Sequence, residues 1–73
     1  MAEEIKAEIV ANVLNVLVHE GDSIADGDTV VLLESMKMEI PVLAEVAGTI
    51  TEMKVAEGEV VRDGDPIAVI EEK

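Results

Sequence analysis

The sequence contains no cysteine, no aromatic residue and only one histidine. Without cysteine, the chain can form no disulfide, no thiolate nucleophile and no cysteine-ligated zinc site. Without aromatic side chains, it has no platform on which the bases of a single-stranded nucleic acid could stack. A single histidine makes no metal cluster, and no Ser-His-Asp set, phosphate loop or catalytic carboxylate pair stands out. We therefore predict no catalytic residue and no metal site.

Positive charge is also scarce, with 5 Lys and Arg residues against 17 Asp and Glu residues and a formal net charge of -12. Such a chain repels the phosphates of nucleic acids and anionic membrane surfaces. Its apolar runs, such as Val30–Leu33, are far too short to cross a membrane, and no signal peptide pattern precedes them. We expect a cytoplasmic protein that is a monomer when isolated and has neither nucleic-acid nor membrane partners.

Aliphatic residues dominate what is present. The apolar fraction is 49%, and 19 residues are Val or Ile, which favour half-buried strands. A chain of 73 residues is long enough for one small core. We therefore predict a single all-β domain that spans residues 1–73.

An internal repeat organises the chain. With an offset of 37 residues, Val16–Glu34 superposes on Met53–Glu71, so that Asp26-Gly27-Asp28 aligns with Asp63-Gly64-Asp65. Two copies are too few for a solenoid, which generally needs three or more units. The repeat instead predicts a quasi-two-fold domain in which each half covers the apolar face of the other.

Each half has the pattern strand, turn, short strand, turn, strand. The turns contain glycine, which adopts positive φ without steric cost. Short strands separated by such turns are typical of an all-β sandwich or barrel. The strands are expected at Asn12–His19, Ser23-Ile24, Thr29–Ser35, Gly48–Val55, Val60-Val61 and Pro66–Glu71.

The segment after Thr29 is ambiguous, because its apolar residues also fit a helical stripe. That stripe comprises Leu32, Leu33, Met36, Ile40 and Leu43. The β-branched start, Pro41 and the repeat itself favour two strands that meet near Met36-Lys37-Met38. Nothing from Thr29 to Ile40 is Gly, Asn, Asp or Pro, the residues that tight hairpin turns prefer. A local rule broken at one point is expected where function resides.

Lys37 is one of four lysines, and the ordinary interpretation is a solvated side chain at a strand end. Three features favour a special role. A tight turn would project its ammonium away from the body and expose Met36 and Met38, whose thioethers are adaptable contact groups. In addition, the second half of the repeat contains no Met-Lys-Met.

The hexapeptide Glu34–Glu39, Glu-Ser-Met-Lys-Met-Glu, resembles the attachment signature of the biotinyl domain, the biotin carboxyl carrier protein of biotin-dependent carboxylases and decarboxylases. The likeness continues through the glycine turns, Ala47–Ile50 and Gly64–Ala68. It implies a flattened barrel-sandwich of two four-stranded antiparallel sheets. Lys37 would lie on a hairpin at one end, and both termini would lie at the other.

The resemblance also implies that Lys37 carries covalent biotin, installed by a biotin protein ligase. Met36 and Met38 would serve ligase recognition, with Glu34, Ser35 and Glu39 as flanking recognition residues. Glu34 and Glu39 stabilise a charged amine rather than activate it, so we assign them to recognition.

As a member of this family the chain would be a carrier and not an enzyme. It would shuttle a carboxyl group between biotin carboxylase and carboxyltransferase subunits, because tethering makes each encounter effectively intramolecular. The opening Met1-Ala2 favours a stand-alone carrier.

Two alternatives remain open. A lipoyl carrier shares the architecture, but its lysine usually lies between an acidic residue and alanine, whereas methionines flank Lys37. An unmodified structural barrel module is the second. The Asp-Gly-Asp sequences look like calcium loops, but the EF-hand register places Ile24 and Leu33 at ligand positions. They are therefore predicted to be turn formers.

Overall fold

The computed structural model describes all residues 1–73 and contains eight strands, with no helix that could cross a membrane. In chain order the strands are β1 (Ala2–Lys6), β2 (Ala11–Val16), β3 (Ser23–Ile24), β4 (Thr29–Ser35), β5 (Met38–Leu43), β6 (Gly48–Met53), β7 (Val60–Val61) and β8 (Pro66–Glu72).

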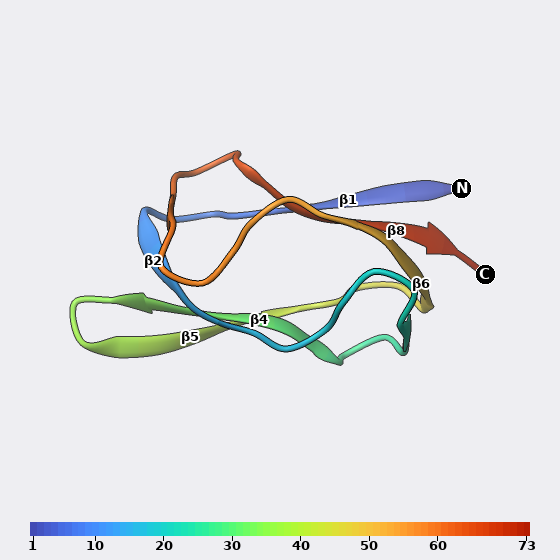
Figure 1. Ribbon diagram of the computed structural model, residues 1–73, viewed down its shortest axis with the longest axis horizontal. Helices are drawn as coiled ribbons and strands as arrows, with labels where there is room; N and C mark the ends of the chain where they lie inside the picture. Colours follow the sequence, from blue (N-terminus) through green and yellow to red (C-terminus); the bar gives the residue numbers. More distant parts are fainter.

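The strands form two antiparallel four-stranded sheets, ordered β1-β8-β6-β3 and β5-β4-β2-β7, which face each other in a body of 35 × 18 × 17 Å (Figure 1). Thirteen buried hydrophobic residues, all Ala, Val, Leu or Ile, fill the space between them. The all-β class and the paired four-stranded sheets predicted above are therefore confirmed.

The repeat is a quasi-two-fold relation of the whole fold. Adding 37 to the bounds of β2, β3 and β4 gives the bounds of β6, β7 and β8. The short strand of each half pairs with the other half, β3 with β6 and β7 with β2. Each sheet contains two strands from each half, so neither half has a complete sheet of its own.

The first strand was not predicted from the residue pattern, which placed no strand before Asn12. β1 is the equivalent of β5, and the repeat extends to Ala7 and Ala44, both buried. The Ala7 N–H donates to the Asp65 carbonyl and the Ala44 N–H donates to the Asp28 carbonyl, each at 2.8 Å. The sequence of β1 is mainly charged and shows no strand pattern, because this edge strand buries little besides part of Ile5.

The Asp-Gly-Asp segments are turns, as predicted. The Asp28 carboxylate accepts the Ala25 N–H at 2.8 Å, and the Asp65 carboxylate accepts the Arg62 N–H at 2.9 Å. In each turn a glycine with positive φ lies between the N–H donor and the carboxylate acceptor; φ is 94° at Gly27 and 91° at Gly64. Each carboxylate therefore closes its own turn.

The helical alternative after Thr29 is wrong, and the predicted hairpin is confirmed. β4 and β5 pair along their lengths up to Ser35 opposite Met38. The hairpin extends from the left of Figure 1, whereas the two chain ends lie together at the right. At that far end, the Glu72 N–H donates to the Met1 carbonyl at 2.8 Å.

Candidate attachment site

The hairpin turn consists of Met36 and Lys37 alone, which connect the paired residues Ser35 and Met38. Both have positive φ, 52° and 65°, and they are the only residues other than glycine that do. Positive φ at both central positions defines a type I′ turn, which normally requires Gly, Asn or Asp. The left-handed conformation costs an ordinary side chain about 1–2 kcal/mol. Strain of this kind persists where function requires the side chain.

The strained turn is maintained because core packing fixes the register of the strands on both sides of it. In β4, Val31 and Leu33 are fully buried in the core. Their partners across the ladder, Val42 and Ile40, pack against the same core. A shift of one residue would turn these side chains out to solvent. The register therefore leaves only two residues to close the turn.

All six predicted site residues lie together on this hairpin. Lys37 is exposed at the tip, with Met36 89% and Met38 62% exposed beside it. Glu39 is also exposed, whereas its ladder partner Glu34 and the neighbouring Ser35 are half-buried at the base of the turn. The expectation that the turn would expose both thioethers is confirmed.

The Lys37 amine makes no ion pair, although carboxylates outnumber cations throughout the chain. By contrast, Lys6 lies 3.7 Å from Glu4 and Lys54 lies 2.8 Å from Glu52. The hydrogen bond and charge of Glu52 raise the pKa of Lys54, which keeps that amine protonated. Among these three lysines, only Lys37 presents a side chain that no carboxylate holds.

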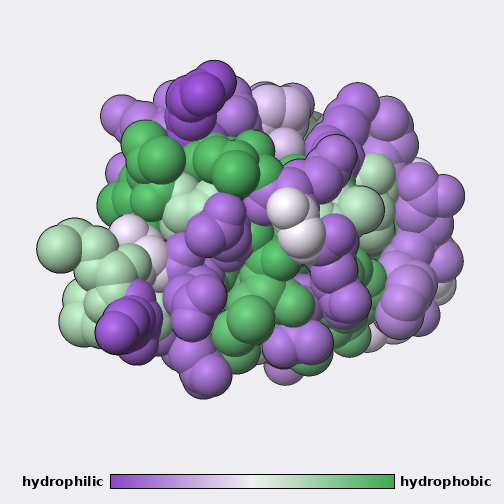
Figure 2. Space-filling view, turned by 60° about the vertical axis from the view of Figure 1, so that its left-hand side comes forward, coloured by the Kyte–Doolittle hydropathy of each residue, from purple (hydrophilic) through white to green (hydrophobic).

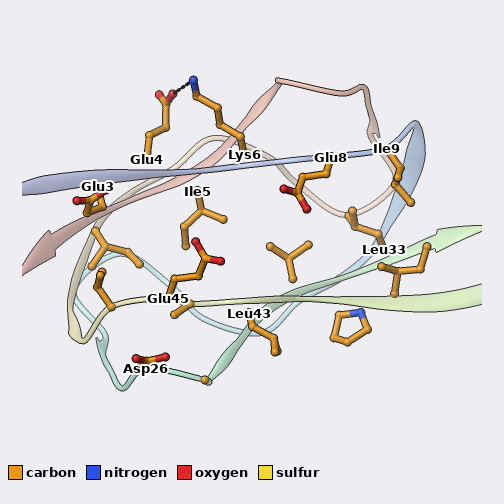
Figure 3. A pocket seen from close by; sticks show the side chains of 17 residues that line it. Glu3, Glu4, Ile5, Lys6, Glu8, Ile9, Asp26, Leu33, Leu43 and Glu45 are labelled. Atoms are coloured by element: carbon orange, nitrogen blue, oxygen red, sulfur yellow. Dashed lines mark ion pairs between the residues drawn. The ribbon is translucent and has the colours of Figure 1, made fainter.

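The hollows of the molecule lie elsewhere. The larger, of about 820 Å³, runs between the edge strands β1 and β5. Figure 3 shows Glu8 and Glu45, which are equivalent in the two halves, directed into the space between the two strands. None of the residues from Glu34 to Glu39 lines it or the smaller hollow beside His19. The candidate site is thus a protrusion rather than a cavity.

The sequence analysis did not identify two exposed apolar residues near the end of the barrel that carries Lys37. Val10 and Val60 are 61% and 57% exposed. The repeat could have identified them, because each is more apolar or larger than its equivalent in the other half. The equivalent of Val60 is Ser23, and the equivalent of Val10 is Ala47.

A small barrel that presents one lysine on a strained, protruding turn, away from its hollows, has the form of a carrier domain for a covalently attached group. A family model described as "Biotin-requiring enzyme" matches residues 3–70. The chain therefore belongs to the family of biotinyl domains of biotin-requiring enzymes, and its cofactor is covalent biotin.

Curated relatives agree with this family. The chain is 77% identical over 44 residues to the "Biotinylated protein TB7.3 homolog" of Mycolicibacterium smegmatis, a match that covers 60% of this chain and 62% of the relative. It is 45% identical over 40 residues to the "Biotin/lipoyl attachment protein" of Bacillus subtilis, which covers 55% of each. The matched segments thus span less than two thirds of these relatives.

Solved structures share the fold. The urea carboxylase of Kluyveromyces lactis matches with a TM-score of 0.91 and 31% identity over 97% of this chain and 6% of that chain. A single-chain long-chain acyl-CoA carboxylase matches with a TM-score of 0.93 and 30% identity over 99% and 7%.

The lipoyl domain of the 2-oxoglutarate dehydrogenase complex from Azotobacter vinelandii also matches, with a TM-score of 0.80 and 27% identity over 94% of this chain and 95% of that one. The barrel alone thus does not separate the two cofactors. The choice of biotin rests on the family and on the biotinylated relatives.

Proposed function

We propose that Lys37 is the residue that carries biotin, and that the chain is a carrier that moves a carboxyl group between a biotin carboxylase and a carboxyltransferase. The observation that carries this proposal is the Lys37 amine, free of any carboxylate partner at the tip of a two-residue turn in left-handed conformation. The group fits the site, because an exposed, unpaired amine is what formation of an amide requires.

The attachment step uses the neutral form of this amine. The Lys37 nitrogen attacks the carbonyl carbon of biotinyl-adenylate, so that a C–N bond forms, the C–O bond to AMP breaks and the nitrogen gives its proton to a base on the ligase. Since lysine is almost entirely protonated at neutral pH, the ligase must supply that base. Glu34 and Glu39 are not assigned as the base, because neither forms an ion pair with the Lys37 amine.

The residues around Lys37 serve recognition in this proposal. Met36 and Met38 offer flexible, polarizable side chains that adapt to the surface of a partner. Glu34 and Glu39 are a directly opposed pair at the base of the hairpin, so their two carboxylates present one negative face. Ser35, half-buried beside them, is the last residue before the turn.

When bound, biotin supplies a ring nitrogen that accepts and releases a carboxyl group. The protein contributes position and mobility. The hairpin holds the modified side chain clear of the barrel, and acylation removes the Lys37 charge, which makes the chain one unit more negative. The acidic body then steers it toward basic surfaces on its partners. The similarity to domains within two carboxylases supports partners of this class.

The proposal is tested by incubating the purified chain with biotin, MgATP and a purified biotin protein ligase, followed by intact mass and peptide mapping. We expect the mass of one biotinyl group on the Lys37 peptide and none in Lys37→Arg. The matched control is Lys54→Arg, which should be modified like the wild type. The modified chain should then accept label from bicarbonate in the presence of a biotin carboxylase and MgATP.

Three results contradict the proposal. Modification at Lys54 or Lys6 would displace the site from the hairpin. The mass of a lipoyl group after expression with both cofactors would favour the lipoyl alternative. Lack of any adduct would leave the unmodified barrel module as the better interpretation.

A further inference from the structure

Apolar side chains gather at the end of the barrel that carries Lys37. Val10, Val60, Met36 and Met38 are 61%, 57%, 89% and 62% exposed, and we name these four the apolar rim. Apart from the terminal Met1, no other large apolar side chain is more than half exposed, and Leu17 follows at 50%. Figure 2, which turns this end forward, shows hydrophobic surface interspersed with hydrophilic residues.

The strand ladder brings these four residues into one region. Asn12 in β2 pairs with Val60 on one side and with Glu34 on the other. Val60 therefore lies two strand spacings, about 10 Å, from Glu34, and Met36 follows Glu34 by two residues. Val10 precedes Ala11, which pairs with Val61. A single protein partner seated over Lys37 would cover the whole rim.

The other end of the molecule shows that the fold does not require this apolar surface. Through the 37-residue offset, Val10, Val60 and Met36 correspond to Ala47, Ser23 and Lys73. The fourth, Met38, corresponds to the terminal Met1. Three of the four positions thus carry a small or polar residue at the end without the attachment lysine, and the fourth carries the terminal Met1, which is 84% exposed. Exposed apolar surface that the core does not need is typical of a contact site.

We propose that the apolar rim is the docking surface for the biotin protein ligase, which would meet it with an apolar patch bordered by basic side chains opposite Glu34 and Glu39. This inference rests on the proposed function. It extends recognition from the hairpin to Val60 in β7 and Val10 before β2, residues that lie outside the attachment sequence.

The position of the reacting atom favours the ligase, rather than the carboxylase partners, as the protein that contacts the apolar rim. In acylation the reacting atom is the Lys37 Nζ, a single side chain away from the turn. The ligase must therefore approach the barrel closely, and the surface around the hairpin base comes into contact with it. In carboxyl transfer, the reacting atom lies a further valeryl chain and ring away, so those enzymes can engage the cofactor with less contact to the barrel.

The test exchanges rim residues for their equivalents at the other end. Val60→Ser and Val10→Ala, singly and combined, place on the rim residues that the same backbone already carries. Biotinylation kinetics are followed by intact mass with a purified biotin protein ligase. We expect kcat/KM to fall about five- to tenfold in the double variant, through a higher KM at unchanged kcat. Since both sites are exposed, the thermal midpoint should stay within a few degrees of the wild type.

The matched control is Ser23→Val, which makes the reverse change at the far end and should leave the kinetics unchanged. Wild-type kcat/KM in the double variant would overturn the docking inference while biotin on Lys37 still upheld the proposed function. Normal biotinylation with impaired carboxyl acceptance would also overturn it and would assign the rim to the carboxylase. Failure of the wild type itself to be modified would instead defeat the proposed function.

Discussion

Ser35 and Met38 form the last pair of the β4–β5 ladder, and two residues in left-handed conformation connect them. Their equivalents at the far end, Glu72 and Met1, are joined by a backbone hydrogen bond of 2.8 Å where the chain is open. The two ends of the barrel therefore have the same backbone plan, but only one is closed by a turn. The turn breaks the quasi-two-fold symmetry, and it places Met36 and Lys37 where turns of this type normally have Gly, Asn or Asp.

Replacement of Met36 by Asn should separate stability from function. Asparagine tolerates the left-handed region, so Met36→Asn should raise the free energy of unfolding by up to about 1 kcal/mol. The loss of the thioether should at the same time lower kcat/KM for biotinylation about tenfold, the equivalent of roughly 1.4 kcal/mol of binding energy. Urea unfolding and mass-based kinetics measure the two effects. A variant that is both more stable and fully biotinylated would show that the strain at Met36 serves no recognition.

Gly48 is held by close packing rather than by its φ. A Cβ at this position would collide with the Glu71 carbonyl oxygen and lie 2.8 Å from Ile70 Cγ2. The β6 and β8 strands must move apart to admit it, so Gly48→Ala should destabilise the fold by about 1–3 kcal/mol. The equivalent residue of the first half, Ala11, shows that the symmetric position accepts a methyl group. An unchanged urea midpoint for Gly48→Ala would mean that the two strands separate readily.

The twin turns provide a test of the quasi-symmetry. Asp28→Ala and Asp65→Ala each remove a carboxylate that accepts one backbone N–H, at 2.8 and 2.9 Å. Each should cost about 0.5–1.5 kcal/mol, and the two losses should be nearly equal. Asp63→Ala is the control, because the Asp63 side chain makes no hydrogen bond within the protein and its loss should be close to neutral. Losses that differ by more than about 1 kcal/mol would show that the halves are energetically unequal.

The local chemistry of the residues was sufficient to predict much of this protein. Val and Ile with regularly spaced glycine turns indicate strands, since positive φ and β-branching are properties of single residues and their neighbours. The 37-residue offset predicted the quasi-two-fold relation, and Met36-Lys37-Met38 was identified because no ordinary turn former stands near it. The same hexapeptide carried the resemblance to the biotinyl domain, which the family match confirmed.

Only the tertiary structure decided what depends on contacts between distant residues. Adjacent valines 60 and 61 are alike in sequence, yet pairing with β2 leaves Val60 exposed and buries Val61. β1 is a strand because it pairs with β8, at the other end of the sequence, and not because of its mainly charged composition. The apolar rim arises in the same way, because strand pairing brings Val60 and Val10 toward Met36. Local sequence determines the strands, the turns and the identity of the attachment lysine. The exposed surface that a partner would contact is determined by which strands pair.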